Sequence, residues 1–341
     1  MHKVEVKASR SYTVTVDSSF DNLHEVVKNI AGSGRIAVIT DDNVAPLYLQ
    51  EITALLNDFN IVVHTVAAGE ASKSIAVYAS LMEELANDGF HRDDTVLTLG
   101  GGVVGDLGAF VASTYMRGVK LISVPTTLLS MIDSSVGGKT AVNLTAGKNL
   151  CGTFYQPHAV YANVRTLATL PESEIVCGIG ELVKYALLDK RITAHDIERY
   201  ANEEVIAECV KIKRDIVEAD EYESGKRMLL NLGHTIGHAV EALSCYTMPH
   251  GLCVLKGLMA IARVSDKYFA WSDATRKAVY SLLGKVDADY SIDYPPDEIL
   301  RTVSLDKKAA STGINTVLIR NVGDCMTVTM SIDRLRSYLV G

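Results

Sequence analysis

The stretch TVLTLGGGVVGDLGAFVAS, residues 95–113, places a run of glycines between an expected strand and an expected helix. Gly100, Gly102 and Gly105 match the G-x-G-x-x-G spacing. Such glycines let the backbone approach a pyrophosphate at a helix N-terminus, where free N–H groups and the helix dipole favour anions. One match is weak, because glycines also serve tight turns, but the strand–loop–helix context supports it. The stretch therefore predicts an α/β fold with a phosphate-binding loop.

Strand and helix patterns alternate around this loop. Apolar runs at residues 35–40, 61–66 and 94–100 read as buried strands, and residues 47–59 and 74–90 carry helical spacing between them. Such alternation predicts a mostly parallel sheet with helices on both faces. We therefore expect an α/β, Rossmann-like N-terminal domain.

The pattern changes near residue 170, where apolar residues begin to recur with a period of 3.6. This periodicity predicts a mainly α-helical C-terminal domain, with a boundary near Pro171 and domains at 1–169 and 170–341. Residues 314–330 read as a hairpin, and Ser331 is expected to cap a final helix.

Composition excludes several classes of protein. The net charge is −8 (33 basic minus 41 acidic residues), which argues against a nucleic-acid binder. The cluster Lys211, Lys213 and Arg214 is interpreted as a solvated helix face. No run of about 18 apolar residues predicts a membrane span. The N-terminus lacks an apolar signal core, and the six cysteines lack CxxC spacing. We expect buried or half-buried free thiols and a cytoplasmic protein.

The glycine loop differs from a standard Rossmann loop in two ways. It follows the third or a later strand, and no acid lies about 20 residues further on to hold a ribose. If NAD binds, its ribose and adenine need other loops. Residues 40–43 (TDDN) and 68–74 (AGEASKS) lie at expected carboxyl ends of strands, where open parallel sheets bind ligands. For either loop alone, an ordinary polar turn is the simpler interpretation.

Residues 124–157 form a stretch rich in glycine and hydroxyl side chains that carries Asp133, Lys139, Lys148 and Asn149. We interpret it as one long irregular segment. Lysines in such a segment can hold phosphates and carboxylates, and long loops in compact domains are usually functional. A single lysine here would be solvated. Together these residues favour one cleft for a cofactor and an acidic substrate.

Residues 226–241, KRMLLNLGHTIGHAVE, read as one helix. On it, Arg227, Asn231, His234 and His238 fall within a stripe about 60° wide. Polar groups in such a stripe are costly in a core unless each has a partner. The stripe therefore favours a pocket wall over a set of isolated core residues.

A carboxylate and a further histidine complete a possible metal site. Glu181 lies three residues before Lys184 on another apolar helix, and His250 lies just before the next one. One carboxylate and two histidines form a three-ligand set of the zinc type with an open position. The run HTIGH is not HExxH, because no glutamate follows His234, and this argues against a zincin protease. Spacing alone leaves open whether His234 and His238 both bind metal or only one does.

Ten longer stretches follow one another in a fixed order over about residues 38–310. They are GEASKS, GGGVVGD, YMRGV, VPTTLLSMIDSSVGGKTAVN, GKNLCGTFYQP, TLATLPESE, GELVKYALL, RMLLNLGHTIGHAVE, PHG and DKK (306–308). Together they resemble the 3-dehydroquinate synthase family of the sugar-phosphate cyclases. This set of long, irregular motifs is far more specific than one glycine loop.

The resemblance implies a division of roles among the candidate residues. Glu181, His234 and His250 would hold Zn²⁺ or Co²⁺, and His238 would belong to the substrate pocket. NAD would be held by Asp41, Asn43, Glu70, Lys73, Gly101, Gly102, Val103, Asp106, Thr126, Thr127, Lys139, Lys148, Thr166, Thr169, Leu170 and Glu174. Substrate would contact Arg117, Asp133, Lys139, Asn149, Lys184, Arg227, Asn231, His238 and Lys307 or Lys308.

The implied reaction belongs to the shikimate pathway, in a homodimeric enzyme. It converts 3-deoxy-D-arabino-heptulosonate 7-phosphate into 3-dehydroquinate and phosphate by NAD-mediated oxidation, phosphate elimination, re-reduction, ring opening and aldol closure. Another sugar-phosphate cyclase, a metal-dependent polyol dehydrogenase and a non-catalytic binding protein are the alternatives. The chain departs from the family at Leu252, where relatives usually have glutamate after His-Gly, and at Leu232, Ile236 and Thr166. With leucine at position 252, the resemblance does not show which residue would hydrogen-bond to the metal ligands and orient them.

Overall fold

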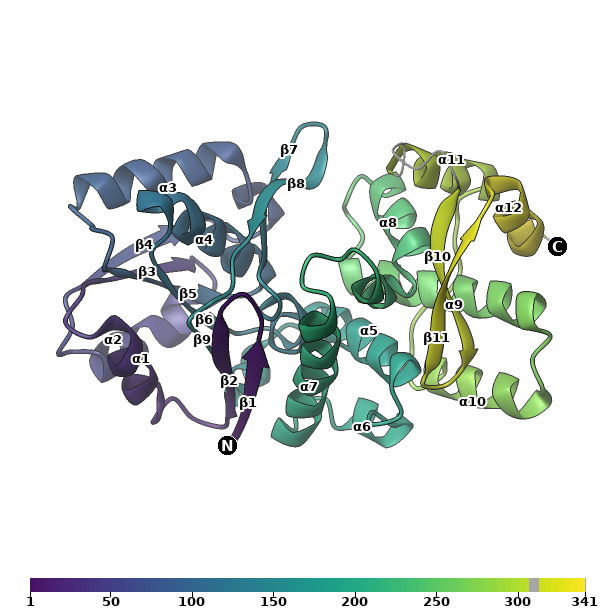
Figure 1. Ribbon diagram of the computed structural model, residues 1–341, viewed down its shortest axis with the longest axis horizontal. Coiled ribbons are helices and arrows are strands. Elements are labelled where there is room, and N and C mark those ends of the chain that lie inside the picture. Colours follow the sequence, from purple (N-terminus) through teal and green to yellow (C-terminus); the bar gives the residue numbers. More distant parts are fainter. Residues whose placement is uncertain (307–312, 341) are drawn as a thin grey trace. The chain divides into compact units, whose positions relative to one another are not determined.

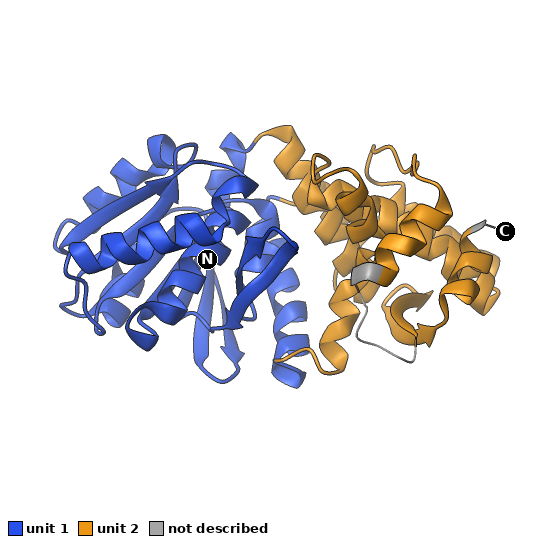
Figure 2. Cartoon of the chain, turned by 90° about the horizontal axis from the view of Figure 1, so that it is seen from above, with its two compact units in different colours: residues 1–170, 201–221 blue, residues 171–200, 222–341 orange. Residues whose placement is uncertain are grey.

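The computed structural model describes residues 1–306 and 313–340. Contacts divide the chain into two compact units, coloured separately in Figure 2. Unit 1 comprises residues 1–170 and 201–221, and unit 2 comprises residues 171–200 and 222–341. No helix in the described part of the chain combines the length and hydropathy needed to span a bilayer.

Unit 1 is built on a seven-stranded sheet in the order β1-β2-β9-β6-β5-β3-β4. Every neighbouring pair except β1–β2 is parallel, so the predicted mostly parallel sheet is confirmed. The sheet strands are β1 (His2–Lys7), β2 (Ser11–Asp17), β3 (Ile36–Asp41), β4 (Ile61–Val66), β5 (Thr95–Gly100), β6 (Lys120–Pro125) and β9 (Ala159–Asn163).

The helices of unit 1 cover both faces of this sheet (Figure 1). They are α1 (Leu23–Ala31), α2 (Gln50–Leu55), α3 (Ile75–Asn87), α4 (Gly102–Thr114) and α7 (Glu203–Ala219), with short helical turns η1 (Ala45–Leu49), η2 (Glu70–Ser72), η3 (Tyr115–Arg117), η4 (Ser130–Ser134) and η5 (Val164–Thr169). Along β3, Ala37 and Ile39 pack with α3 and α4, whereas Ile36 and Val38 pack with α1 and α2. Burial on both faces explains why this strand is continuously apolar.

Residues 124–157 are not the irregular segment that composition predicted. They contain η4 and an antiparallel hairpin, β7 (Lys139–Leu144) with β8 (Gly147–Phe154). Gly137 and Gly138 have φ of 94° and 70°, which lets the chain turn sharply into β7. Buried apolar side chains, including Ile132 and Val142, anchor the segment. Its glycines and hydroxyl residues therefore make tight turns within ordered structure.

Unit 2 is mainly helical, as expected, with α9 packed against most of its other elements. Its elements are α5 (Glu172–Leu188), α6 (Ala194–Glu198), η6 (Lys226–Asn231), α8 (His234–Leu243), α9 (His250–Phe269), α10 (Asp273–Leu283), α11 (Pro296–Asp306), β10 (Ile314–Asn321), β11 (Asp324–Met330) and α12 (Ile332–Val340). The predicted hairpin is β10–β11, which packs on α9. Arg334 N donates to Ser331 Oγ (3.2 Å), which confirms the predicted cap of α12.

The two units differ from the expected domains in one element. The first crossing between the units lies between Leu170 and Pro171, but residues 201–221, which include α7, belong to unit 1. The periodicity of α7 predicts a helix without revealing which surface it covers. In the structure α7 packs on β1, β2 and η4. Unit 2 is therefore formed by two separate stretches of chain.

Three further expectations need correction. Residues 226–241 are not one helix, because η6 and α8 are separated at Leu232–Gly233, where Gly233 adopts a φ of 80°. Lys213 does not lie on a solvated face: it is 6% exposed. The six cysteines are free, but Cys245 is exposed, because it lies in the turn that follows α8.

Asp17 links the end of β2 to its neighbours. Its carboxylate accepts hydrogen bonds from Ser18 N (2.9 Å), Asn22 Nδ2 (2.9 Å) and Tyr161 Oη (3.0 Å). Burial would raise the pKa of Asp17, but these donors hold it below its usual range. The stabilisation is therefore present above the unfolded pKa of about 3.9 and is lost as the pH falls through the lower folded pKa.

We expect Asp17→Ala to lower the free energy of unfolding at pH 7 by about 1–3 kcal/mol, because three hydrogen bonds to the carboxylate are lost. The difference from the unsubstituted protein should shrink below about pH 4, where the carboxylate becomes protonated. Urea unfolding at pH 7 and pH 3 measures both effects. A difference that is equal at the two pH values would contradict this role.

Candidate functional site

The helix α5 brings a buried ion pair into unit 2. The side chains of Glu181 and Lys184 are each 1% exposed, and Lys184 Nζ lies 2.5 Å from Glu181 Oε2. Burial would raise the pKa of Glu181, but Lys184 and His234 hold it well below its usual range. Glu181 is therefore an ionised carboxylate inside the protein, with its second oxygen directed at the histidines.

Two histidines face this second oxygen. Glu181 Oε1 lies 3.4 Å from Nε2 of His234, the first residue of α8, and 3.3 Å from Nε2 of His250, the first residue of α9. These distances are long for hydrogen bonds. An ion held tetrahedrally by bonds of about 2.0–2.1 Å has ligand atoms about 3.3–3.4 Å apart. Glu181 thus lies from each of the two histidines at the spacing that a zinc-type ion requires, and the histidine atoms lie within 4.8 Å of one another.

His238 lies beside them. Ligand atoms of His234, His238 and His250 all lie within 4.8 Å of one another, and the ring centroids of His234 and His238 are 5.0 Å apart. Three imidazoles could also hold a divalent ion. Unlike Glu181, His238 is exposed. The geometry therefore fits Glu181 with two histidines and also accommodates a set of three histidines.

Glycines allow these helices to approach closely enough to form the cluster. A Cβ at Gly180 would lie 2.4 Å from Gly251 O, and one at Gly251 would lie 2.0 Å from Cys177 O, which fixes α5 against the start of α9. A Cβ at Gly257 would lie 2.0 Å from Gly233 O, which fixes α8 against α9. Backbone contacts at these positions determine where Glu181 and the histidines meet.

The outer nitrogens of the two predicted ligand histidines also have acceptors. His234 Nδ1 lies 3.1 Å from Leu232 O, and His250 Nδ1 lies 3.1 Å from Glu241 Oε2. Burial would lower the pKa of His250, but the carboxylates of Glu181 and Glu241 raise it to about 9. The two carboxylates therefore favour the protonated form of His250, and an ion held by Nε2 would have to displace the proton there.

The remaining predicted residues of the stripe lie on η6. Arg227 is 1% exposed, and Asn231 Nδ2 donates to Glu223 Oε1 (2.8 Å). They do not share a helix with His234, because the chain breaks at Gly233. A buried guanidinium in the same unit as the metal cluster is suited to holding an anion.

The other predicted substrate residues that the structure describes belong to unit 1. Asp133 is in η4, Lys139 begins β7, Asn149 lies in β8, and Arg117 lies in η3. Arg117 and Asn149 have φ of 65° and 56°. Such conformations are uncommon for residues other than glycine and are frequent at functional sites. Lys307 and Lys308 lie outside the described residues.

The predicted cofactor loops gather at one edge of the sheet. From β3 the chain passes outward to β4 and then returns across β3 to β5, so the direction of winding reverses between β3 and β5. Ligands of open parallel sheets bind beyond the carboxyl ends of the strands at such a switch point. Asp41 ends β3, and Gly101 with Gly102 follows β5 to begin α4. The glycine loop thus lies between a strand and a helix, as predicted.

Several predicted cofactor residues contact one another at this edge. Lys73 Nζ lies 2.5 Å from Asp106 Oδ2, and Lys148 Nζ lies 3.8 Å from Glu70 Oε1. Thr166 Oγ1 donates to the backbone oxygen of residue 126 (3.1 Å).

Of the other predicted cofactor residues, Asp41 and Thr169 make contacts within unit 1, and Glu174 belongs to unit 2. Asp41 Oδ1 accepts from the backbone N–H groups of Asn43 and Val44, which caps the turn after β3. Thr169 Oγ1 contacts Tyr48 Oη at the end of unit 1. Glu174 lies on α5 and belongs to unit 2.

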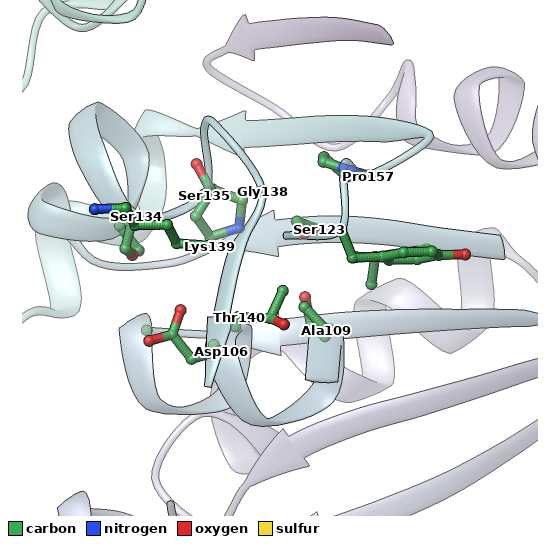
Figure 3. Close-up of a pocket in the computed structure, with 17 residues that line it drawn as sticks. Asp106, Ala109, Ser123, Ser134, Ser135, Gly138, Lys139, Thr140 and Pro157 are labelled. Atoms are coloured by element: carbon green, nitrogen blue, oxygen red, sulfur yellow. The ribbon is translucent and has the colours of Figure 1, made fainter. Parts of the chain in front are cut away.

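Two features of this edge of the sheet are suited to binding a nucleotide. Thr126 is 3% exposed, and its hydroxyl oxygen is buried without a hydrogen-bond partner among the described residues. A pocket lies beside the glycine loop, and Figure 3 shows Asp106, Ser134, Ser135 and Lys139 along it. A Cβ at Gly105 would meet no atom within 4 Å. Donors and open space are thus both present beside the N-terminus of α4.

Three residues that contact the predicted site residues were not predicted from the sequence. Lys213 Nζ pairs with the carboxylate of Asp133, Glu223 accepts from Asn231, and Glu241 contacts His250. Lys213 belongs to a basic cluster on an amphipathic helix, and nothing in that pattern separates a buried lysine from solvated ones. Glu241 follows His238 by three residues, so helical spacing could have indicated that it lies near the histidines.

Known proteins with similar sequences or structures share the fold described above. A crystal structure of 2-deoxy-scyllo-inosose synthase, complexed with carbaglucose-6-phosphate, NAD⁺ and Co²⁺, superposes with a TM-score of 0.88 at 25% identity and covers 99% of both chains. The 3-dehydroquinate synthases of Clostridium acetobutylicum (37% identity over 96% of both chains) and Pyrococcus abyssi (42% identity over 81% of this chain and 83% of the relative) are also similar.

The fold and these similarities define a sugar-phosphate cyclase. Residues 63–177 match the family described as 3-dehydroquinate synthase N-terminal, and residues 178–309 match 3-dehydroquinate synthase C-terminal. The chain belongs to the 3-dehydroquinate synthase family.

Proposed function

We propose that this chain is a 3-dehydroquinate synthase, a lyase that converts 3-deoxy-D-arabino-heptulosonate 7-phosphate into 3-dehydroquinate and phosphate. The observation that carries the proposal is the cluster of Glu181, His234 and His250 at metal-ligand spacing, in a chain that is 37% identical to a 3-dehydroquinate synthase over nearly its full length. The structural neighbour that binds NAD⁺ and Co²⁺ supports the same cofactors.

The two units supply different groups to the reaction. Unit 1 would hold NAD through the loops at the switch point between β3 and β5, where the N-terminus of α4 offers free N–H groups to a pyrophosphate. Unit 2 would hold Zn²⁺ or Co²⁺ through Glu181, His234 and His250. When bound, NAD would accept and return one hydride, and the ion would polarise substrate oxygen atoms.

The side chains around the ion orient the substrate and balance its charge. Lys184 neutralises the oxygen of Glu181 that faces away from the histidines, and Arg227 offers a buried cation to a carboxylate or phosphate. His238 is exposed beside the proposed ligands, where it can exchange a proton with substrate. Asp133, Lys139 and Asn149 are proposed to complete substrate recognition from unit 1.

A phosphate-release assay tests the proposal. The purified protein, with substoichiometric NAD and Zn²⁺ or Co²⁺, is expected to release one phosphate per heptulosonate phosphate while NADH absorbance stays flat, because the hydride is returned in each cycle. A chelator should stop release, and added metal should restore it. Stoichiometric NADH from a simple polyol, without phosphate release, would point to a dehydrogenase and overturn the proposal.

A second cyclase activity deserves a parallel assay because of the fold shared with 2-deoxy-scyllo-inosose synthase. Glucose 6-phosphate, the natural counterpart of the carbocyclic ligand in that structure, should release no phosphate under the same conditions. We further propose a cytoplasmic homodimer, on the basis of the family resemblance. Light scattering should give about twice the chain mass of 36.9 kDa.

A further inference from the structure

Glu241 is a buried carboxylate that none of the proposed catalytic steps uses. It lies on α8, is 5% exposed, and places Oε2 3.1 Å from His250 Nδ1. Burying a carboxylate is costly unless a charged or hydrogen-bonding partner compensates it. The partner that the structure provides is a proposed metal ligand.

The contact determines which nitrogen of His250 can bind an ion. A carboxylate accepts hydrogen bonds only, so when an ion takes the place of the proton on Nε2, the remaining proton of His250 lies on Nδ1 and Glu241 accepts it. Its Nε2 then carries the lone pair, and Nε2 is the atom that faces Glu181. His234 is arranged in the same way, because its Nδ1 faces Leu232 O and its Nε2 faces Glu181.

We propose that Glu241 is a positioning residue for the metal centre, which holds the His250 ring with Nε2 directed at the ion. This inference rests on the proposed metal ligands, because Glu241 would act through its contact with His250.

The backbone of Glu241 supports the same role. Its carbonyl oxygen accepts from Tyr246 N (3.0 Å) and from Ser244 Oγ (2.7 Å), so the residue also organises the turn that leads towards His250. Leu252, two residues after His250, offers no side-chain acceptor. The carboxylate beside His250 Nδ1 comes from α8 instead.

Charge balance gives Glu241 a second effect. An ion of charge +2 and the carboxylates of Glu181 and Glu241 together would have no net charge. Lys184 brings the net charge of this group to +1. Without Glu241 the buried group would carry two positive charges. Metal binding should therefore weaken even if the ring of His250 keeps its orientation.

The test compares Glu241→Ala, Glu241→Gln and Glu84→Ala. Glu84 is a matched control, because its carboxylate lies 2.9 Å from Nδ1 of a different histidine, His64, in unit 1. The measurements are the Zn²⁺ dissociation constant, by competition with a chromophoric chelator, and the visible absorption spectrum of the Co²⁺ form. Thermal unfolding of the metal-free proteins checks folding independently.

We expect Glu241→Ala to weaken Zn²⁺ binding by about 10–100-fold and to change the Co²⁺ spectrum, as loss of an outer partner of a ligand histidine does. Glu241→Gln keeps an acceptor oxygen of similar reach and should recover part of the affinity. Glu84→Ala should match the unsubstituted protein in both measurements.

An affinity and spectrum unchanged in both Glu241 variants would overturn the positioning role while leaving the metal centre intact. Absence of Zn²⁺ binding in the unsubstituted protein would instead remove the proposed metal centre and this role with it. If Glu241→Ala does not fold, the comparison of Glu241→Gln with the unsubstituted protein tests the positioning role, because glutamine preserves the shape of the side chain.

Discussion

His250→Ala is expected to yield a folded protein without bound metal, whereas His238→Ala should retain the ion. His250 Nε2 lies 3.3 Å from Glu181 Oε1, within the spacing of a shared ion, whereas His238 is exposed beside the cluster. Removal of a ligand should weaken metal binding by more than the roughly 100-fold that loss of an outer partner costs. Activity should fall with metal content in His250→Ala. In His238→Ala, activity should fall although the metal content is unchanged.

Elemental analysis after dialysis, together with phosphate release, measures both quantities. Glu181→Ala separates the two possible ligand sets, because a centre of three histidines would survive it. Full metal content in Glu181→Ala, with loss in His238→Ala, would show that the imidazoles alone hold the ion. Equal metal content in His250→Ala and the unsubstituted protein would remove His250 from the centre altogether.

Gly257→Ala is expected to destabilise the protein by about 3 kcal/mol or more, towards the upper end of overpacking effects. The added Cβ would lie 2.0 Å from Gly233 O, and backbone atoms cannot move aside by changing a rotamer. The helices α8 and α9 would have to separate, which would displace His234 from Glu181. Metal affinity should therefore fall together with the free energy of unfolding.

Gly105→Ala is the matched control for this prediction. It lies inside α4, and its Cβ would meet no atom within 4 Å. Alanine in a helix interior is favoured over glycine by about 0.5–1 kcal/mol, so this variant should gain stability. Urea unfolding of the metal-free proteins measures both changes. If Gly257→Ala unfolded at the same urea concentration as the unsubstituted protein, the glycine contact between α8 and α9 would be unimportant.

The sequence alone determined the features that depend on local chemistry. Uninterrupted apolar runs such as residues 36–39 require burial on both faces, and this requirement identifies a parallel sheet between helices. The turn at Gly323 follows from a backbone conformation that few other residues adopt, and the glycine loop at 100–102 is recognised from its spacing between a strand and a helix. The order of the long motifs was sufficient to indicate the family that the comparisons confirm.

Only the tertiary structure decided which side chains meet. Periodicity identifies α7 as a helix but does not show that it packs on unit 1 or that Lys213 is buried against Asp133. The break at Gly233 could not be predicted, because it depends on the close approach of Gly257 from the next helix. The contact of Glu241 with His250 joins two helices across a turn. A sequence records local preferences, whereas burial and ion pairing depend on residues that are distant along the chain.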